Sequence, residues 1–209
     1  MAGGMAEVVT TGTGQVPRTA DRAVLTVVFS AVAAERQQAI ADLAARVSGL
    51  ETTLGAEHVE VASRTLSVRP HVADGAPAGS RAVQHFMLRV GDPAALEQLA
   101  AELIDAEPER LDGPRWELSD PTEATDEAQR LAVHDARRRA ESYADALGVR
   151  LGELVRLSDV GADRPRASGP AAPQLGGASR GTAAHVRELD LTPGEVTVTV
   201  VCNATWNLA

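Results

Sequence analysis

The sequence predicts an α+β protein with two lobes, in which a mostly antiparallel or mixed sheet forms one layer and helices pack on one face of it. Alternating apolar and polar residues at 23–33 and 196–206 indicate strands. Apolar residues recurring at steps of three and four over 34–54 indicate an amphipathic helix. Hairpin-like neighbours without a regular strand–helix–strand alternation argue against a doubly wound parallel sheet.

The first two strands and the first helix come from residues 7–54. Residues 7–16 form a short strand that ends at Pro17, and residues 23–33 form the next. We expect the helix at 34–54 to end at Gly55 in the left-handed conformation. Its expected buried stripe consists of Ile40, Leu43, Val47, Leu50 and Leu54.

A hairpin and a second helix follow. Segments 59–69 and 82–90 are strand-like, and the turn-rich stretch 74–80 between them suits a hairpin with a mobile tip. Asp92 and Pro93 are typical of a helix start, with the aspartate as N-cap and the proline at the first helical position. The stripe of this helix consists of Leu96, Leu99 and Leu103.

The second half of the chain contains the longest predicted helix, which follows a short extended segment at 111–118. Asp120 and Pro121 repeat the helix-start pattern, Glu123 completes a capping box, and Gly148 ends the helix. We expect an outer surface with i,i+4 acid–base pairs at Asp126–Arg130 and Asp135–Arg139. The expected inner face consists of Ala124, Ala128, Leu131, Ala136, Ala140, Tyr143 and Leu147.

The remaining segments are two strands separated by a loop. Residues 151–160 read as a strand, 161–181 as a flexible loop, and 185–191 as an extended segment. The last strand has Val196, Val198, Val200, Cys202, Ala204 and Trp206 on one face.

Composition excludes several classes of partner. The net charge of −9 and an aromatic share of 2% argue against nucleic acid, which needs a basic surface and stacking side chains. No apolar run approaches the ~20 residues of a membrane span. Residues 1–10 lack the pattern of a signal peptide, so we expect a cytoplasmic protein, or a periplasmic or secreted one if a leader has been removed.

Candidate chemical motifs are few, and we predict no catalytic, cofactor-binding or metal-binding residue. Residues 11–14, Thr-Gly-Thr-Gly, are followed by another strand and not by a helix, which favours a turn or bulge over a phosphate loop. The cysteine at position 202 is the only one, which excludes an internal disulfide, and we expect a buried, inert thiol. A hairpin could bring two of the histidines, His71 and His85, together as metal ligands, although isolated histidines are the favoured interpretation. The histidines are His58, His71, His85, His134 and His185.

Several segments, in order, resemble the SIMPL domain family, over about residues 6–208. The segments are 9–14 with Pro17 and 21–23, 81–92, 118–121, 135–137, 140–141, 146–149, 151–152 and 192–196. The resemblance implies an α+β fold in two lobes, residues 6–62 with 115–208 and residues 63–114. It also implies homo-oligomers, links to envelope or oxidative stress in bacteria, and adaptor-like signalling in animals; it supplies no catalytic residue.

Three functions follow as hypotheses. The first is a non-enzymatic, self-assembling scaffold or stress-associated protein that forms homo-oligomers and contacts protein partners. The alternative is a module that binds a small molecule or peptide in a groove between the lobes, covered by the 161–181 loop. The third is an enzyme or redox protein acting through Cys202.

Overall fold

The computed structural model describes residues 6–167 and 191–209, and these residues form two compact units. Unit 1 contains the described segments 6–19, 118–167 and 194–209, and unit 2 contains segments 20–117 and 191–193. Each unit has its own antiparallel sheet and its own apolar core. The predicted α+β class is therefore confirmed.

Unit 2 is built on a four-stranded sheet in the order β3-β4-β2-β5, in which all neighbours are antiparallel. The strands are β2 (Arg22–Ala33), β3 (Val59–Ala73), β4 (Ala76–Val90) and β5 (Arg110–Glu117). Asp74 and Gly75 join β3 to β4 with φ of 52° and 80°. Two successive positive φ values are those of the tight hairpin turn in which Asp-Gly is favoured. The hairpin strands therefore extend further toward the turn than the predicted segments 59–69 and 82–90.

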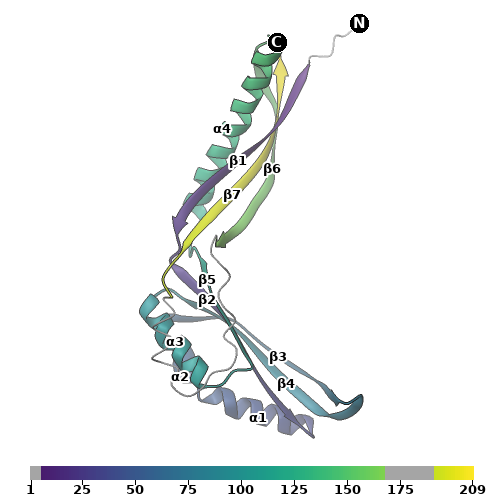
Figure 1. Cartoon of the computed structure of the whole chain (residues 1–209), viewed down its shortest axis with the longest axis vertical. Coiled ribbons are helices and arrows are strands. Elements are labelled where there is room, and N and C mark those ends of the chain that lie inside the picture. Colours follow the sequence, from purple (N-terminus) through teal and green to yellow (C-terminus); the bar gives the residue numbers. More distant parts are fainter. Residues whose placement is uncertain (1–5, 168–190) are drawn as a thin grey trace. The chain divides into compact units, whose positions relative to one another are not determined.

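Three helices of unit 2 are α1 (Arg36–Ser48), α2 (Glu51–Leu54) and α3 (Pro93–Asp105). Helices α1 and α3 pack against β2 and β4 (Figure 1). Phe29 and Phe86 meet edge to face within this core, with ring centroids 6.3 Å apart. The predicted stripe of α3 is confirmed, since Leu96, Leu99 and Leu103 are all buried.

Two details of the first helix differ from the prediction. Ile40, the first residue of the predicted buried stripe, is 37% exposed, and the neighbouring Ala39 is buried in its place. Gly55 has φ of −92°, so no left-handed cap forms there. The remaining predicted members of the stripe, Leu43, Val47, Leu50 and Leu54, are buried.

Ion pairs run across unit 2's sheet from strand to strand. Glu117 on β5 contacts Arg22 on β2 at 2.9 Å and Arg89 on β4 at 3.4 Å. Arg89 in turn contacts Glu60 on β3 at 3.1 Å. The Glu117 and Arg22 side chains are about one quarter exposed, so water screens this pair less than it screens a fully exposed pair.

Unit 1 combines a three-stranded sheet with one long helix. The strands β1 (Glu7–Thr19), β7 (Glu195–Leu208) and β6 (Leu151–Ala167) lie in the order β1-β7-β6, so the last strand of the chain is central. Helix α4 (Thr122–Leu147) runs along this sheet and packs over β1 and β7 (Figure 1). The predicted alternation of β7 is confirmed, because its even-numbered residues from Val196 to Trp206 are buried.

The predicted helix boundaries depend on local capping. The Asp92 carboxylate accepts a hydrogen bond from Ala94 N at 3.0 Å, as expected for an N-cap. The Asp120 carboxylate accepts from Thr122 N at 2.9 Å, although α4 itself begins at Thr122. Gly148 has φ of 69° and ends α4 in the predicted left-handed conformation.

The division into units differs from the expected lobes. Residues 20–62 were expected with residues 115–208, but β2 pairs with β4 and β5 and therefore lies in unit 2. Residues 161–167, expected as the start of the 161–181 loop, belong to β6, which continues to Ala167. The rest of that loop, and the extended segment expected at 185–191 up to residue 190, lie outside the described residues.

None of the helices in the described part of the chain is long and apolar enough to cross a membrane.

Candidate functional site

Helix α4 contacts its sheet through a row of alanines. The buried residues of α4 are Ala124, Ala128, Ala132, Ala136, Ala140 and Ala144, each four positions after the last. Residues four apart lie on one face of a helix, so these side chains form a single row, called here the alanine row. The predicted inner face was wrong at its three largest members, because Leu131, Tyr143 and Leu147 are exposed.

Two glycines of β1 explain why the helix face is made of small residues. A Cβ atom placed on Gly12 would lie 1.9 Å from the carbonyl oxygen of Ala132, and one on Gly14 would lie 1.9 Å from that of Ala128. Both distances are far inside van der Waals contact, so only glycine fits at either position. The Thr-Gly-Thr-Gly segment is thus an uninterrupted part of β1 and not the turn or bulge that the sequence suggested.

Hydrogen bonds fix the helix to this strand. The Thr10 hydroxyl, which is buried, donates to the carbonyl oxygen of Ala136 at 2.8 Å. The backbone N–H of Thr13 donates to Asp135 Oδ2 at 3.2 Å. Asp135 therefore satisfies a backbone donor at the outer edge of β1, a position where a neighbouring strand would otherwise bind.

Asp135 is the centre of a small charged cluster. Arg138 and Arg139 both contact its carboxylate, the latter at 2.9 Å, which confirms the predicted pair with Arg139. The hydrogen bond from Arg138 is the main reason why the pKa of Asp135 is lowered, and the Thr13 N–H acts in the same direction. The carboxylate is therefore ionised over the whole neutral range.

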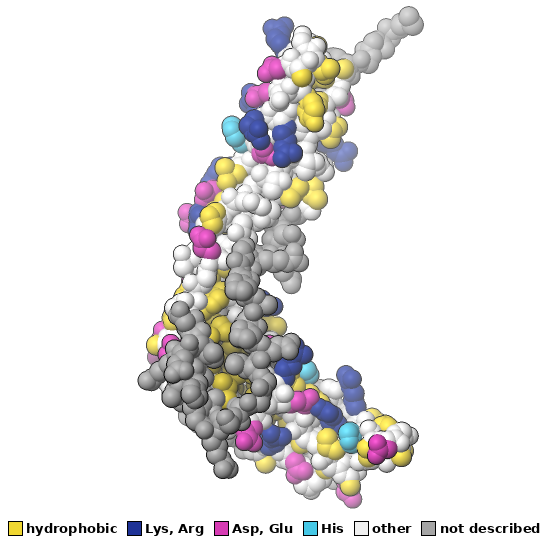
Figure 2. Space-filling view, viewed as in Figure 1, with side chains coloured by type: hydrophobic (Ala, Val, Ile, Leu, Met, Phe, Trp, Pro, Cys, Tyr) yellow, Lys and Arg dark blue, Asp and Glu magenta, His cyan; other side chains and the backbone are white. Residues whose placement is uncertain are grey.

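A second row of α4 lies beside the outer edge of β1. This β1-side row consists of Glu127, Leu131, Asp135, Arg139, Tyr143 and Leu147. Its position follows from two contacts with β1, between Glu127 and Arg18 and between Asp135 and Thr13. Leu131 is 43% exposed, Tyr143 59% and Leu147 66%, so the largest apolar side chains of the helix face outward. Figure 2 shows hydrophobic side chains between charged ones on the surface of unit 1.

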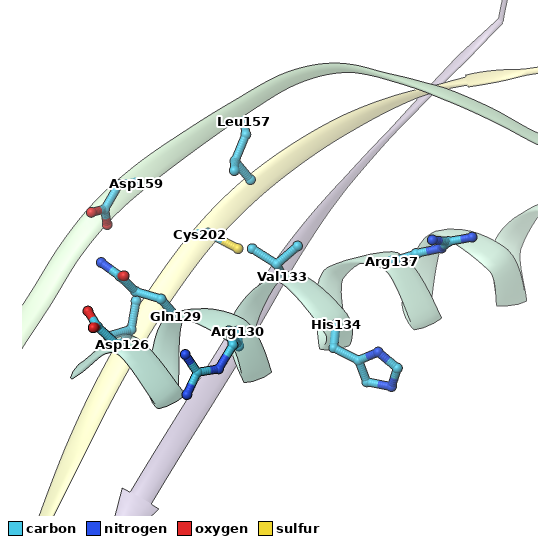
Figure 3. A pocket seen from close by; sticks show the side chains of 10 residues that line it. Asp126, Gln129, Arg130, Val133, His134, Arg137, Leu157, Asp159 and Cys202 are labelled. Carbon is cyan, nitrogen blue, oxygen red and sulfur yellow. The ribbon is translucent and has the colours of Figure 1, made fainter. Parts of the chain in front are cut away.

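The opposite side of α4 borders a groove. Because α4 packs over β1 and β7, a cavity of about 650 Å³ remains between α4 and β6. Val133, Leu157 and Cys202 point toward one another, whereas Arg130 and His134 point away from β6 (Figure 3). The lining of this α4–β6 groove is completed by Asp126, Gln129, Arg137, Asp159 and Val200.

The sequence matches a known protein family over nearly its whole length. The family model described as "SIMPL: Protein of unknown function (DUF541)" matches residues 8–206. The chain belongs to the SIMPL family. No protein with a curated description matches it in the sequence comparison. The match runs through both units of this SIMPL chain, as the resemblance predicted.

Cys202 of this SIMPL chain is buried, as predicted. It is 5% exposed and lies on the helix-facing side of β7, opposite Gly12 of β1. Burial raises the pKa of its thiol above the usual range. The thiol is therefore protonated at neutral pH, which is the less nucleophilic form.

The histidines of this SIMPL chain do not form a cluster in the described residues. The register of the hairpin places Thr65 opposite His85, and His71 lies six residues, about 20 Å, further along β3. The idea of a His71–His85 metal pair is therefore wrong. His134 is on α4, and His185 lies outside the described residues. Within 6–167 and 191–209, no group of three or more His, Cys, Asp or Glu side chains is placed to hold a metal ion.

The β1-side row was not predicted from the sequence, because its three apolar members were placed on the inner face together with the alanines. Leu131, Tyr143 and Leu147 were assigned to the core since large apolar residues are usually buried. The signal that could have located them was the unbroken four-residue spacing of the alanines. Small residues at that spacing, together with Gly12 and Gly14, indicate close packing of the helix on a strand.

Proposed function

We propose that this SIMPL chain acts without catalysis, as a scaffold that assembles with further copies of itself. The observation that carries the proposal is the outward orientation of Leu131, Tyr143 and Leu147 on α4. An isolated exposed apolar residue needs no explanation, but several on one row of one helix are typical of an interaction surface.

The outer edge of β1 in unit 1's sheet supports the same proposal. Among described residues, β1 pairs with β7 alone, in one unbroken register from Glu7 to Thr19. Two features protect part of its outer edge from pairing with another strand. The Thr13 N–H is bonded to Asp135, and Pro17 has no N–H to donate. The pairing of β6 is interrupted by several bulges, a feature that makes an edge a poor template for further strands.

Sedimentation velocity on the purified chain tests the proposal. We expect species heavier than the 21.8 kDa monomer at micromolar concentration, with a distribution that shifts with concentration. A single 21.8 kDa species at every concentration, together with recovery of no second, differently tagged copy from cells, would overturn it.

The α4–β6 groove supports a second candidate, a module that binds a small apolar molecule or peptide. Its apolar floor of Val133, Leu157 and Val200, with charged residues at the rim, has the composition of many ligand sites. An apolar fluorescent dye is the probe. We expect the change Leu157→Glu to abolish dye binding while the self-assembly seen by sedimentation persists; equal dye binding by both forms would remove this candidate.

A link to oxidative or envelope stress is the part of the proposal that rests on family resemblance. Cells that lack the chain should then survive an oxidant or an envelope-damaging agent less well than cells that carry it. Equal survival under both treatments would remove this part and leave the scaffold proposal standing.

A further inference from the structure

We propose that two copies of the chain associate through their β1-side rows, with the two α4 helices antiparallel across a two-fold axis. This inference rests on the proposed self-assembly and specifies the surface that carries it. The partner is a second copy of the same chain, because the part of the row from Leu131 to Tyr143 is complementary to itself in one orientation only.

The order of residues along the row establishes this complementarity. If the two rows run antiparallel about the point midway between Asp135 and Arg139, Leu131 lies opposite Tyr143 of the second copy. Asp135 then lies opposite Arg139 of the second copy, and the reciprocal pairs follow from the symmetry. Between positions 131 and 143, apolar side chains thus meet apolar ones and an acid meets a base, whereas Glu127 and Leu147 lie opposite each other at the two ends of the row.

The parallel orientation lacks this match. It would place Asp135 opposite Asp135 and Arg139 opposite Arg139, and like charges that face each other are destabilising. A contact between this row and a different surface of the second copy would not use the order apolar, acidic, basic, apolar along positions 131 to 143. Isologous, antiparallel pairing therefore accounts for the whole sequence of side chains from position 131 to position 143.

The contact is compatible with the bonds already described. Gly12 and Gly14 bring α4 directly above β1, so two α4 helices at the usual interaxial distance of about 8–10 Å hold the two β1 strands at a similar distance. Paired strands need about 4.7–4.9 Å, so the strands do not pair. The bonds from Asp135 to Thr13 and from Glu127 to Arg18 can therefore persist in the dimer.

The inference can be tested by chemical cross-linking of the 209-residue chain with Cys202→Ala, which removes the single cysteine of this sequence. Two single variants, Leu131→Cys and Tyr143→Cys, are used separately and mixed, with a short bis-maleimide. Positions 131 and 143 are 12 residues apart, about 18 Å along one helix, beyond the reach of such a reagent. In the antiparallel dimer, 131 of one copy lies about 18 Å from 131 of the other, whereas 131 and 143 are opposite.

We expect covalent dimers from the mixture and almost none from either variant alone. Efficient cross-linking of Leu131→Cys to itself would overturn the antiparallel arrangement. If the parent protein sediments as an oligomer and no combination cross-links, the β1-side row is not the interface, although self-assembly itself stands. If the parent is a monomer, both the inference and the proposed function fail.

Surface substitutions give a second, independent measurement. Leu131→Glu places a charge opposite the apolar Tyr143 of the second copy and should weaken association by about tenfold or more. Leu66→Glu is the matched control, because Leu66 is 55% exposed in unit 2 and is not part of the row. Circular dichroism verifies that both variants fold. Equal association of the two folded variants would overturn the inference.

Discussion

The backbone N–H of Thr13 donates a hydrogen bond to the carboxylate of Asp135, with 3.2 Å between the nitrogen and Oδ2. This bond joins the outer edge of β1 to α4, across 122 positions of sequence. Because the bond requires the ionised carboxylate, we expect the free energy of unfolding of unit 1 to fall in acid.

Asp135→Asn should lower the free energy of unfolding and flatten its dependence on acid. The pKa of Asp135 is lowered in the folded chain, so its contribution is fully present above the unfolded value of about 3.9 and is lost as the pH falls through the folded value. We expect a loss of about 1–2 kcal/mol at pH 7, since hydrogen bonds to a charged, partly exposed group are lost. Urea unfolding of the parent and of Asp135→Asn between pH 7 and pH 2 measures the difference between their free energies of unfolding. If this difference is the same at pH 7 and pH 2, Asp135 is not the source of the pH dependence.

Gly12→Ala should destabilise unit 1 strongly. The added methyl group would lie 1.9 Å from the Ala132 carbonyl oxygen, so β1 and α4 must separate, and overpacking of this kind costs about 1–3 kcal/mol or more. Gly49→Ala is the matched control, because its added Cβ has no atom within 4 Å and its φ of −65° suits alanine. Thermal unfolding should show a large fall in Tm for the first variant and almost none for the second. Similar Tm values would mean that the close approach of strand and helix is not required.

Glu117→Ala should destabilise unit 2 more than removal of an exposed ion pair does. It leaves two arginines, Arg22 and Arg89, without the carboxylate that they share, at an expected cost of about 1–3 kcal/mol. Glu141→Ala is the comparison, since the exposed pair with Arg137 contributes about 0.3–0.5 kcal/mol. Denaturant unfolding in low and high salt measures the free energy of unfolding that each variant loses. Equal losses for the two variants would show that the ion pairs across the sheet contribute no more than an exposed surface pair.

Cys202 should react slowly with a thiol reagent while unit 1 is folded, although it lines the α4–β6 groove, and rapidly once unit 1 unfolds. Its burial and its raised pKa both keep the reactive thiolate scarce at neutral pH. The absorbance change with an aromatic disulfide reagent should therefore be slow in buffer and rapid in denaturant. Rapid reaction of the folded chain at pH 7 would revive the hypothesis of a redox function.

Local sequence patterns were sufficient to predict most individual elements. The alternation of β7 and the stripe of α3 depend on nearby residues, whose periods of two and of three to four are visible in the sequence. The caps at Asp92 and Gly148 are equally local. Elements of this kind were predicted correctly because their causes lie within a few residues of their positions.

The arrangement of these elements could not be predicted in the same way. Nothing local to residues 22–33 indicates that β2 pairs with β4 and β5, because pairing partners are set by contacts far apart in sequence. The face of α4 was predicted incorrectly for a similar reason. Its buried side is chosen by Gly12 and Gly14, more than a hundred residues away, and not by the hydrophobicity of α4 itself.

The central position of β7 in unit 1 determines when the sheet of this unit can form during synthesis. Strands β1 and β6 are not neighbours in the sheet, and both pair with β7, which leaves the ribosome after either of them. The sheet of unit 2 needs only residues 22–117, so it is complete while the middle of the chain is still being synthesised. Strand β1 therefore finds its partner only after more than 170 further residues have been translated, and a chain that stops between Glu117 and Glu195 contains all four strands of unit 2's sheet but lacks the strand that joins β1 to β6.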